Sequence, residues 1–198
     1  MAVRKILRMG HPTLRRVARV LADDEIDSDA VHRLTADMID TLHDYGGIGL
    51  AAPQVNEPIR LAIIEVPGGT SRYGEIPALP LTVFVNPELR IVDETCAGFW
   101  EGCLSVPGLR GFVERPQRII VTATNLMREQ ITLELRGFLA TVFQHEFDHL
   151  DGRLYIDHIK DSSKLVFEEE YERYVAPAEA EEPSADKEPS ADKEPSTE

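Results

Sequence analysis

The chain has 198 residues, of which 42% are hydrophobic and 28% charged, and its formal net charge is −14. This length and composition are typical of one globular domain and exclude fibrous and collagen-like proteins. No apolar run reaches the length of a transmembrane helix, and residues 1–6 are too short and too charged for a secretory signal. We therefore expect a cytoplasmic protein without a membrane partner.

The negative charge is concentrated at the C-terminus. Residues 168–198 contain twelve acidic and three basic residues, so the preceding part is only mildly acidic and has no basic stripe for direct nucleic-acid binding. From residue 176 the composition changes, and the hexamer Glu-Pro-Ser-Ala-Asp-Lys occurs at 182–187 and again at 188–193. Because a repeat without hydrophobic residues cannot compensate for the entropy lost on ordering, we predict one folded domain over 1–175 and a disordered tail over 176–198.

Helices are predicted near both ends of the domain and strands in its middle. One helix begins at Asp27 or Ser28, either of which could cap it, and ends at Gly46-Gly47. Further helices are expected at 12–21, 137–150 and 164–175. Runs rich in branched residues predict antiparallel strands at 60–66, 81–85, 119–124 and 131–135. This grouping predicts an α+β fold in which short antiparallel strands pack around the helix at 137–150.

The segment 144–152, with the sequence Gln-His-Glu-Phe-Asp-His-Leu-Asp-Gly, has the pattern of a divalent-metal site. Residues four apart lie on one face of a helix, so His145 and His149 can direct two imidazoles at one cation, with Glu146 beside it. The alternative interpretation is a pair of buried structural histidines. Two histidines and a glutamate at these offsets are nonetheless a fairly specific signal, which favours the metal site.

A catalytic metal site normally has three protein ligands, so a third ligand is required. The long zinc-protease pattern would place a histidine where this chain has Tyr155. A glutamate on a following helix would instead complete a zinc endopeptidase, and the glutamates at 168–170 are candidates, although they also resemble an ordinary solvated run. The remaining candidate is Cys103, whose thiolate is a soft ligand. The other cysteine, Cys96, is expected to be a small buried hydrophobic residue.

A further segment, 47–55, is small and apolar up to Gln54. Small residues allow another backbone to approach closely, and the amide of Gln54 could donate a hydrogen bond to a polarised carbonyl oxygen. Taken alone, the segment is more often a packing contact or a strand bend than part of a functional site.

The segments 47–54, 101–105 and 144–152 together resemble the peptide deformylases. The family motifs Gly-x-Gly-x-Ala-Ala-x-Gln, Glu-Gly-Cys-x-Ser and Gln-His-Glu-x-Asp-His-x-x-Gly occur in this order at 47–54, 101–105 and 144–152, and the likeness extends over about residues 3–160. The resemblance implies removal of the N-formyl group from the initiator methionine of nascent proteins. The implied metal ligands are Cys103, His145 and His149. Metal-bound hydroxide would attack the formyl carbon, with Glu146 as general acid and base.

The resemblance implies roles for other residues as well. Gln54 and the backbone N–H of Leu104 would stabilise the developing oxyanion. The residues implied to shape the narrow site and to contact the substrate are Gly47, Ile48, Gly49, Phe99, Gly102, Arg110, Phe138 and Val142. Ordinary core packing for the apolar members, and a solvated charge for Arg110, are the alternatives. Arg115 is expected to pair with Glu101 and so to support the cysteine loop.

The implied cofactor is Fe²⁺, with Zn²⁺, Ni²⁺ or Co²⁺ as possible substitutes. The implied partners are N-formylmethionyl nascent peptides and, where these emerge, the ribosome. A zinc endopeptidase and a non-catalytic relative are the competing hypotheses. A deformylase would use Cys103 as a metal ligand, whereas the zinc endopeptidase would not. The presence of Glu146 and Gln54 argues against a non-catalytic relative.

Overall fold

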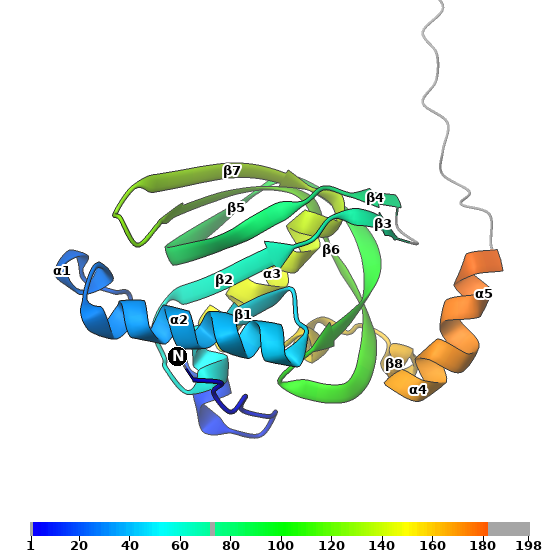
Figure 1. Ribbon diagram of the computed structural model, residues 1–198. Coiled ribbons are helices and arrows are strands. Elements are labelled where there is room, and N and C mark those ends of the chain that lie inside the picture. Colours follow the sequence, from blue (N-terminus) through cyan, green and yellow to red (C-terminus); the bar gives the residue numbers. More distant parts are fainter. Residues whose placement is uncertain (1, 72–73, 182–198) are drawn as a thin grey trace, which may run out of the picture.

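The computed structural model describes residues 2–71 and 74–181, which form one sheet of six strands, a separate hairpin and helices on both faces of the sheet (Figure 1). The sheet order is β1-β2-β5-β6-β7, with β8 paired to the other end of β6, and every pair is antiparallel. The strands are β1 (Gly49–Ala51), β2 (Leu61–Val66), β3 (Gly69–Ser71), β4 (Gly74–Ile76), β5 (Leu79–Cys103), β6 (Val106–Thr124), β7 (Gln130–Arg136) and β8 (Leu165–Phe167).

Two α-helices dominate the helical part, and both confirm the sequence prediction. The helix α2 (Asp29–Tyr45) begins where the Ser28 hydroxyl accepts a hydrogen bond from the Val31 N–H, and it ends at Gly46 in the left-handed conformation. The helix α3 (Gly137–Leu150) carries the histidine motif. The remaining helical segments are short: η1 (Pro12–Arg15), α1 (Asp23–Ile26), η2 (Ala52–Val55), η3 (Tyr155–His158), η4 (Ser162–Lys164), α4 (Glu168–Glu170), the π-helical turn η5 (Tyr171–Val175) and α5 (Ala176–Glu181).

The alternating side chains of β2 explain how the two long helices are placed. Ala62 and Ile64 face the cluster that includes α3, whereas Leu61 and Ile63 face the cluster that includes α2. All four side chains are fully buried. The strand therefore has apolar residues at every position rather than at alternate ones, because α2 and α3 cover opposite faces of the sheet at β1 and β2 (Figure 1).

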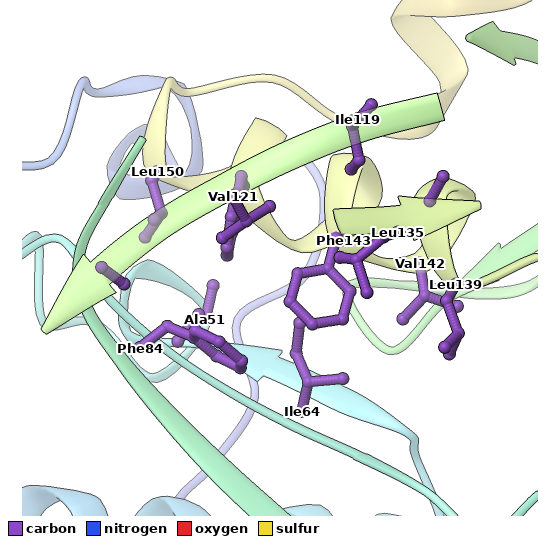
Figure 2. Close-up of a cluster of buried hydrophobic side chains, with 14 of the residues drawn as sticks. Ala51, Ile64, Phe84, Ile119, Val121, Leu135, Leu139, Val142, Phe143 and Leu150 are labelled. Carbon is purple, nitrogen blue, oxygen red and sulfur yellow. The ribbon is translucent and has the colours of Figure 1, made fainter. Parts of the chain in front are cut away.

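The face toward α3 contains the aromatic centre of the core. Figure 2 shows Phe143 of α3 in the middle of this cluster, between Ile64 on one side and Ile119 and Val121 of β6 on the other. The Phe143 ring packs edge-to-face on Phe84, with ring centroids 5.1 Å apart. Since α3 holds the histidine motif, this packing fixes the height and rotation of the motif relative to the sheet.

The four predicted strands lie within β2, β5, β6 and β7, and the α+β class is confirmed. The strands β5 and β6 are much longer than expected because they continue through several register shifts as one bent hairpin. The strand β5 ends at Cys103, so the cysteine motif lies beside the turn that leads to β6.

Three expectations were wrong. The helix predicted at 12–21 is limited to η1, because the following segment runs extended and Arg19 bridges to Ile59. The helix predicted at 164–175 begins with a strand instead, since Leu165–Phe167 pairs with the edge of β6. Cys96 is exposed rather than buried, because it lies in the irregular outer part of the β5–β6 hairpin.

Part of the tail predicted over 176–198 falls on described residues. A helix, α5, spans Ala176–Glu181, the first six residues of the predicted tail. The rest of the predicted tail, 182–198, lies outside the described residues. Within the described ranges, no helix is both long and apolar enough to span a membrane.

The turn after α3 gives the first testable prediction. Gly152 has a positive φ of 71°, and a Cβ there would lie 2.8 Å from the carbonyl carbon and oxygen of Arg15. Gly137 also has a positive φ of 58°, but a Cβ there would meet no atom within 4 Å. The free energy of unfolding of Gly137→Ala should therefore fall by about 1 kcal/mol, because alanine is strained in the left-handed conformation. That of Gly152→Ala should fall by more than about 3 kcal/mol, because the two backbones must also separate.

Urea unfolding of the two variants and the wild type measures this difference. Equal losses of unfolding free energy in both variants would show that the close approach of η1 to the end of α3 contributes nothing.

Candidate metal centre

The helix α3 presents His145, Glu146 and His149 to the interior. His145 and His149 are four residues apart and their ring centroids are 5.2 Å apart, so one helical face carries both imidazoles. All three side chains are buried. Burying a polar group without a compensating interaction destabilises the fold, so three buried polar side chains in one place indicate a functional role.

Cys103 reaches the same place from the end of β5. Its Sγ lies 3.3 Å from Nε2 of His149, and the ligand atoms of Cys103, His145 and His149 all lie within 4.8 Å of one another. Among the described residues, these three form the one cluster of potential ligands that could hold a metal ion. A thiolate and two imidazoles are a suitable donor set for zinc, iron, nickel or cobalt, and three protein ligands leave room for water or substrate.

The surroundings favour the ligating form of the cysteine. Burial alone would raise the pKa of the Cys103 thiol, but the neighbouring imidazoles of His149 and His145 lower that pKa well below its ordinary value. The sulfur also accepts hydrogen bonds from the Ser105 N–H at 3.4 Å and from Nε2 of Gln54 at 3.7 Å. The thiolate, which is the form that binds a cation, is thus stabilised by its neighbours.

A buried ion-pair network orients the first histidine. Nδ1 of His145 lies 2.7 Å from a carboxylate oxygen of Glu101, so Nδ1 is the donor and Nε2 is directed at the cluster. Arg115 donates to both oxygens of Glu101, at 2.6 and 3.1 Å, which confirms the expected pair. Arg115 also donates to Asp148 of α3 at 2.8 Å. The network therefore connects β5, β6 and α3 directly behind the cluster.

Glu146 lies beside the cluster without being one of its ligands. Its Oε2 is buried and has no hydrogen-bond partner among the described residues. Burial is the main cause that raises the pKa of this carboxyl group. A Cβ on Gly49 would lie 2.5 Å from the Glu146 carboxyl group, so the missing side chain at position 49 is what gives this carboxyl its space.

Gln54 is held by both ends of its amide. Its Oε1 accepts a hydrogen bond from the Ala51 N–H at 2.8 Å, and its Nε2 donates to the Ser105 hydroxyl at 3.2 Å. These contacts direct the amide nitrogen toward Cys103. The segment 47–55 is thus more than a strand bend, because β1 and η2 place its small residues and its amide against the cluster.

A cavity of about 1010 Å³ opens onto the cluster. The residues that the resemblance implied as ligands, catalytic groups and substrate contacts all line it except His149, whose Nε2 lies 3.3 Å from Sγ of Cys103. The apolar members also pack in the core: Phe99 and Val142 are buried, and Ile48 and Phe138 are half-buried. Core packing and cavity lining are therefore not alternatives for these residues.

The sequence did not point to several other lining residues. They come from the N-terminal segment and from β5, and include Lys5, Leu7, His11 and Trp100. No motif marks them, since each reaches the cavity only through tertiary packing.

The protease hypothesis required a third ligand among the glutamates at 168–170. Glu168 instead forms an ion pair with Arg110, with 2.6 Å between Nη2 and Oε1. Neither Glu169 nor Glu170 belongs to the ligand cluster. Tyr155 stacks on His145, with ring centroids 5.9 Å apart, so it supports the histidine rather than replacing a ligand.

The ion-pair network gives the second prediction. Glu101→Gln keeps the shape of the side chain but removes the charge that orients His145 and neutralises Arg115, so the affinity for Zn²⁺ should fall about 10- to 100-fold. Titration with Zn²⁺ against a competing chelator measures this affinity. Glu114→Gln, an exposed change that breaks only the ion pair with Lys160, is the matched control. Equal affinity in the two variants would contradict the orienting role.

Comparison with known proteins agrees with this geometry. The sequence model of the polypeptide deformylase family matches residues 3–165. Peptide deformylase 1 of Prochlorococcus marinus is 44% identical over 172 residues, which cover 87% of this chain and 88% of that protein. A peptide deformylase of Leptospira biflexa is 38% identical over 170 residues, covering 86% and 95% of the two chains.

Solved structures resemble the fold as well. The class I type b peptide deformylase of Acinetobacter baumannii, with Met-Ala-Ser bound, has a TM-score of 0.73 at 32% identity, covering 80% of this chain and 99% of that one. The Thermotoga maritima peptide deformylase has a TM-score of 0.71 at 35% identity, covering 81% and 100%. The match spans all three motifs and nearly the full length of these proteins, so this chain belongs to the polypeptide deformylases, metal-dependent hydrolases that remove the N-formyl group from nascent peptides.

Proposed function

We propose that this chain hydrolyses the formyl amide of N-formylmethionyl nascent peptides at the cluster of Cys103, His145 and His149. The observation that carries the proposal is the position of Glu146, a buried carboxyl group beside three potential metal ligands and next to an open cavity, whose Oε2 has no hydrogen-bond partner among the described residues. A carboxyl group that is neither a ligand nor paired is available for proton transfer.

Cys103, His145 and His149 would hold the metal. A divalent cation there polarises a water molecule and withdraws electron density from a carbonyl group. The donor set suits several metals, and we propose Fe²⁺ as the physiological one, following the resemblance to the deformylases, with Zn²⁺, Ni²⁺ or Co²⁺ as substitutes.

Glu146 would act as both base and acid. It takes a proton from the attacking water, and it returns that proton to the nitrogen of the leaving amine, so that formate and a free methionine N-terminus are released. Its burial restricts exchange of this proton with bulk solvent. Gly49 keeps the space in which the carboxyl group can turn from one partner to the other.

The negative charge on the formyl oxygen requires donors. The amide nitrogen of Gln54, held toward Cys103, would supply one, and the backbone N–H of Leu104 in the turn after Cys103 would supply another. The hydrogen bonds with Ala51 and Ser105 hold the Gln54 amide before the substrate binds, so little reorganisation of this donor accompanies the reaction.

The rest of the cavity would bind the formylated methionine. Gly47, Gly49 and Gly102 would keep the reacting end narrow enough to favour a formyl group over larger acyl groups. The methionine side chain would contact Ile48, Phe99, Phe138 and Val142, and Arg110 would face the peptide backbone. The substrates imply that the protein acts in the cytoplasm near the ribosome, and we assign the reaction to a catalytic unit of residues 1–175.

Formate release from formyl-Met-Ala-Ser tests this proposal. The anaerobically purified wild type should release formate. Glu146→Ala should keep its metal and lose activity by at least about 100-fold, because it loses the acid and base but no ligand. Cys103→Ala should lose the metal as well, whereas a glutamate-ligated protease would keep it. A fully metallated wild type that releases no formate would refute the proposal, and its activity on casein would then test the protease hypothesis.

The identity of the metal can be tested separately. Protein loaded with iron should lose formate release during exposure to peroxide, because ferrous iron and the Cys103 thiolate are both oxidised. Protein loaded with zinc, which has no redox chemistry, shows how much of this loss comes from the thiolate alone. Full activity of the iron-loaded protein after long exposure would contradict the proposal of iron.

A further inference from the structure

Arg110 lies at the mouth of the cavity on β6, next to the backbone that leads into Cys103. A Cβ placed on Gly102 would lie 2.7 Å from its Nη1 and 2.9 Å from the central carbon of its guanidinium group. The guanidinium therefore covers Gly102, which directly precedes the candidate ligand Cys103. The side chain is 35% exposed, so part of it faces the cavity that it lines.

Glu168 occupies two of the three guanidinium nitrogens. Its Oε1 accepts hydrogen bonds from Nε of Arg110 at 3.0 Å and from Nη2 at 2.6 Å. The third nitrogen, Nη1, is the one closest to Gly102, and it donates to no acceptor among the described residues. Glu168 thus neutralises the charge of Arg110 on one side and directs its remaining donors toward the cavity.

The C-terminal segment places Glu168 there through strand register. The strand β8 pairs with β6 so that Val166 lies opposite Arg110, and Glu168 follows two residues later on the same side of the extended chain. One turn further on, Tyr171 packs against Trp100, with ring centroids 5.0 Å apart. In Figure 1 the segment from β8 to α4 lies beside the end of the β5–β6 hairpin.

None of these contacts follows from the family comparison. The family match ends at residue 165, so Glu168 and Tyr171 lie beyond it. Both contact residues that line the cavity, and Glu168 lines it as well. The segment after the family match is therefore part of the cavity wall in this chain.

We propose that Glu168 is a positioning residue for the peptide substrate: it holds Arg110 so that Nη1 donates a hydrogen bond to a backbone carbonyl of the chain beyond the formylmethionine. The inference rests on the proposed function, because it takes the cavity as the place where the formylated peptide binds. The neutralised guanidinium recognises a neutral carbonyl, which every nascent chain presents at that point. Without Glu168, the same arginine would carry an unpaired charge on a flexible side chain and would prefer a free carboxylate.

Two substrates separate these two states of Arg110. Formyl-Met-Ala-Ser ends in a carboxylate, and its C-terminal amide does not. In Glu168→Ala the KM for the amide should rise about three- to tenfold, because Arg110 is no longer held, while kcat stays within about twofold. The KM for the free acid should rise less or fall, so the preference shifts toward the acid. Glu168→Gln keeps an acceptor oxygen, so its KM for the amide should be close to that of the wild type. It does not neutralise Arg110, so the preference should still shift toward the acid.

Matched controls assign the effect to Arg110. Glu169→Ala removes a neighbouring acidic side chain that forms no ion pair among the described residues, and it should leave both KM values unchanged. In an Arg110→Ala background, Glu168→Ala should have no further effect, since Glu168 acts through the arginine. An unchanged amide KM in Glu168→Ala, or an equal effect with and without Arg110, would overturn the inference.

Binding of the product peptides tests the inference independently of catalysis. Calorimetric titration of the zinc-loaded protein with Met-Ala-Ser and Met-Ala-Ser amide should show the same shift in preference in Glu168→Ala. If the wild type binds these peptides but releases no formate, the proposed function fails and the titration still decides the role of Glu168. If formate is released and the preference does not change, this inference alone fails.

Discussion

The buried guanidinium of Arg115 is the contact on which the centre depends. It belongs to β6, whereas its two carboxylate partners, Glu101 and Asp148, belong to β5 and α3. The strand β5 and the helix α3 also supply the candidate metal ligands, so the guanidinium of Arg115 fixes the relative position of these two elements. Removing one member of such a buried network leaves an uncompensated charge, at a cost of about 3–5 kcal/mol. The ion pairs thus favour one register of helix and hairpin over any other.

The packing of the apolar core determines how closely α3 approaches the sheet at this network. Because α2 and α3 cover opposite faces of β1 and β2, the segment between them carries small residues, and the helix motif approaches the strand backbone closely. Gly49 and Glu146 illustrate the consequence, since the carboxyl group occupies the space that a Cβ would need. Close packing and a buried carboxyl group beside the cluster are therefore two results of the same arrangement.

The C-terminal segment adds contacts beyond the residues that match the family. The strand β8 continues the sheet at the free edge of β6, and the helical turns after it lie against the hairpin near the cavity. A segment added at a sheet edge can change the cavity wall without disturbing the ligands, because the residues it contacts, Arg110 and Trp100, are not candidate ligands. Chains of one family can differ in this way in their substrate contacts while keeping the same chemistry.

The sequence by itself determined the features that depend on neighbours along the chain. The spacing of His145, Glu146 and His149 follows from helical periodicity, and the limits of α2 follow from a capping serine and a left-handed glycine. The resemblance of three motifs then supplied Cys103 as the partner of the histidines. Only the tertiary structure decided that β5 and β6 form one long bent hairpin, that Cys96 is exposed and that Glu168 reaches Arg110. Each of these depends on which strands pair and in what register, and pairing between distant segments leaves no local pattern from which it could be predicted.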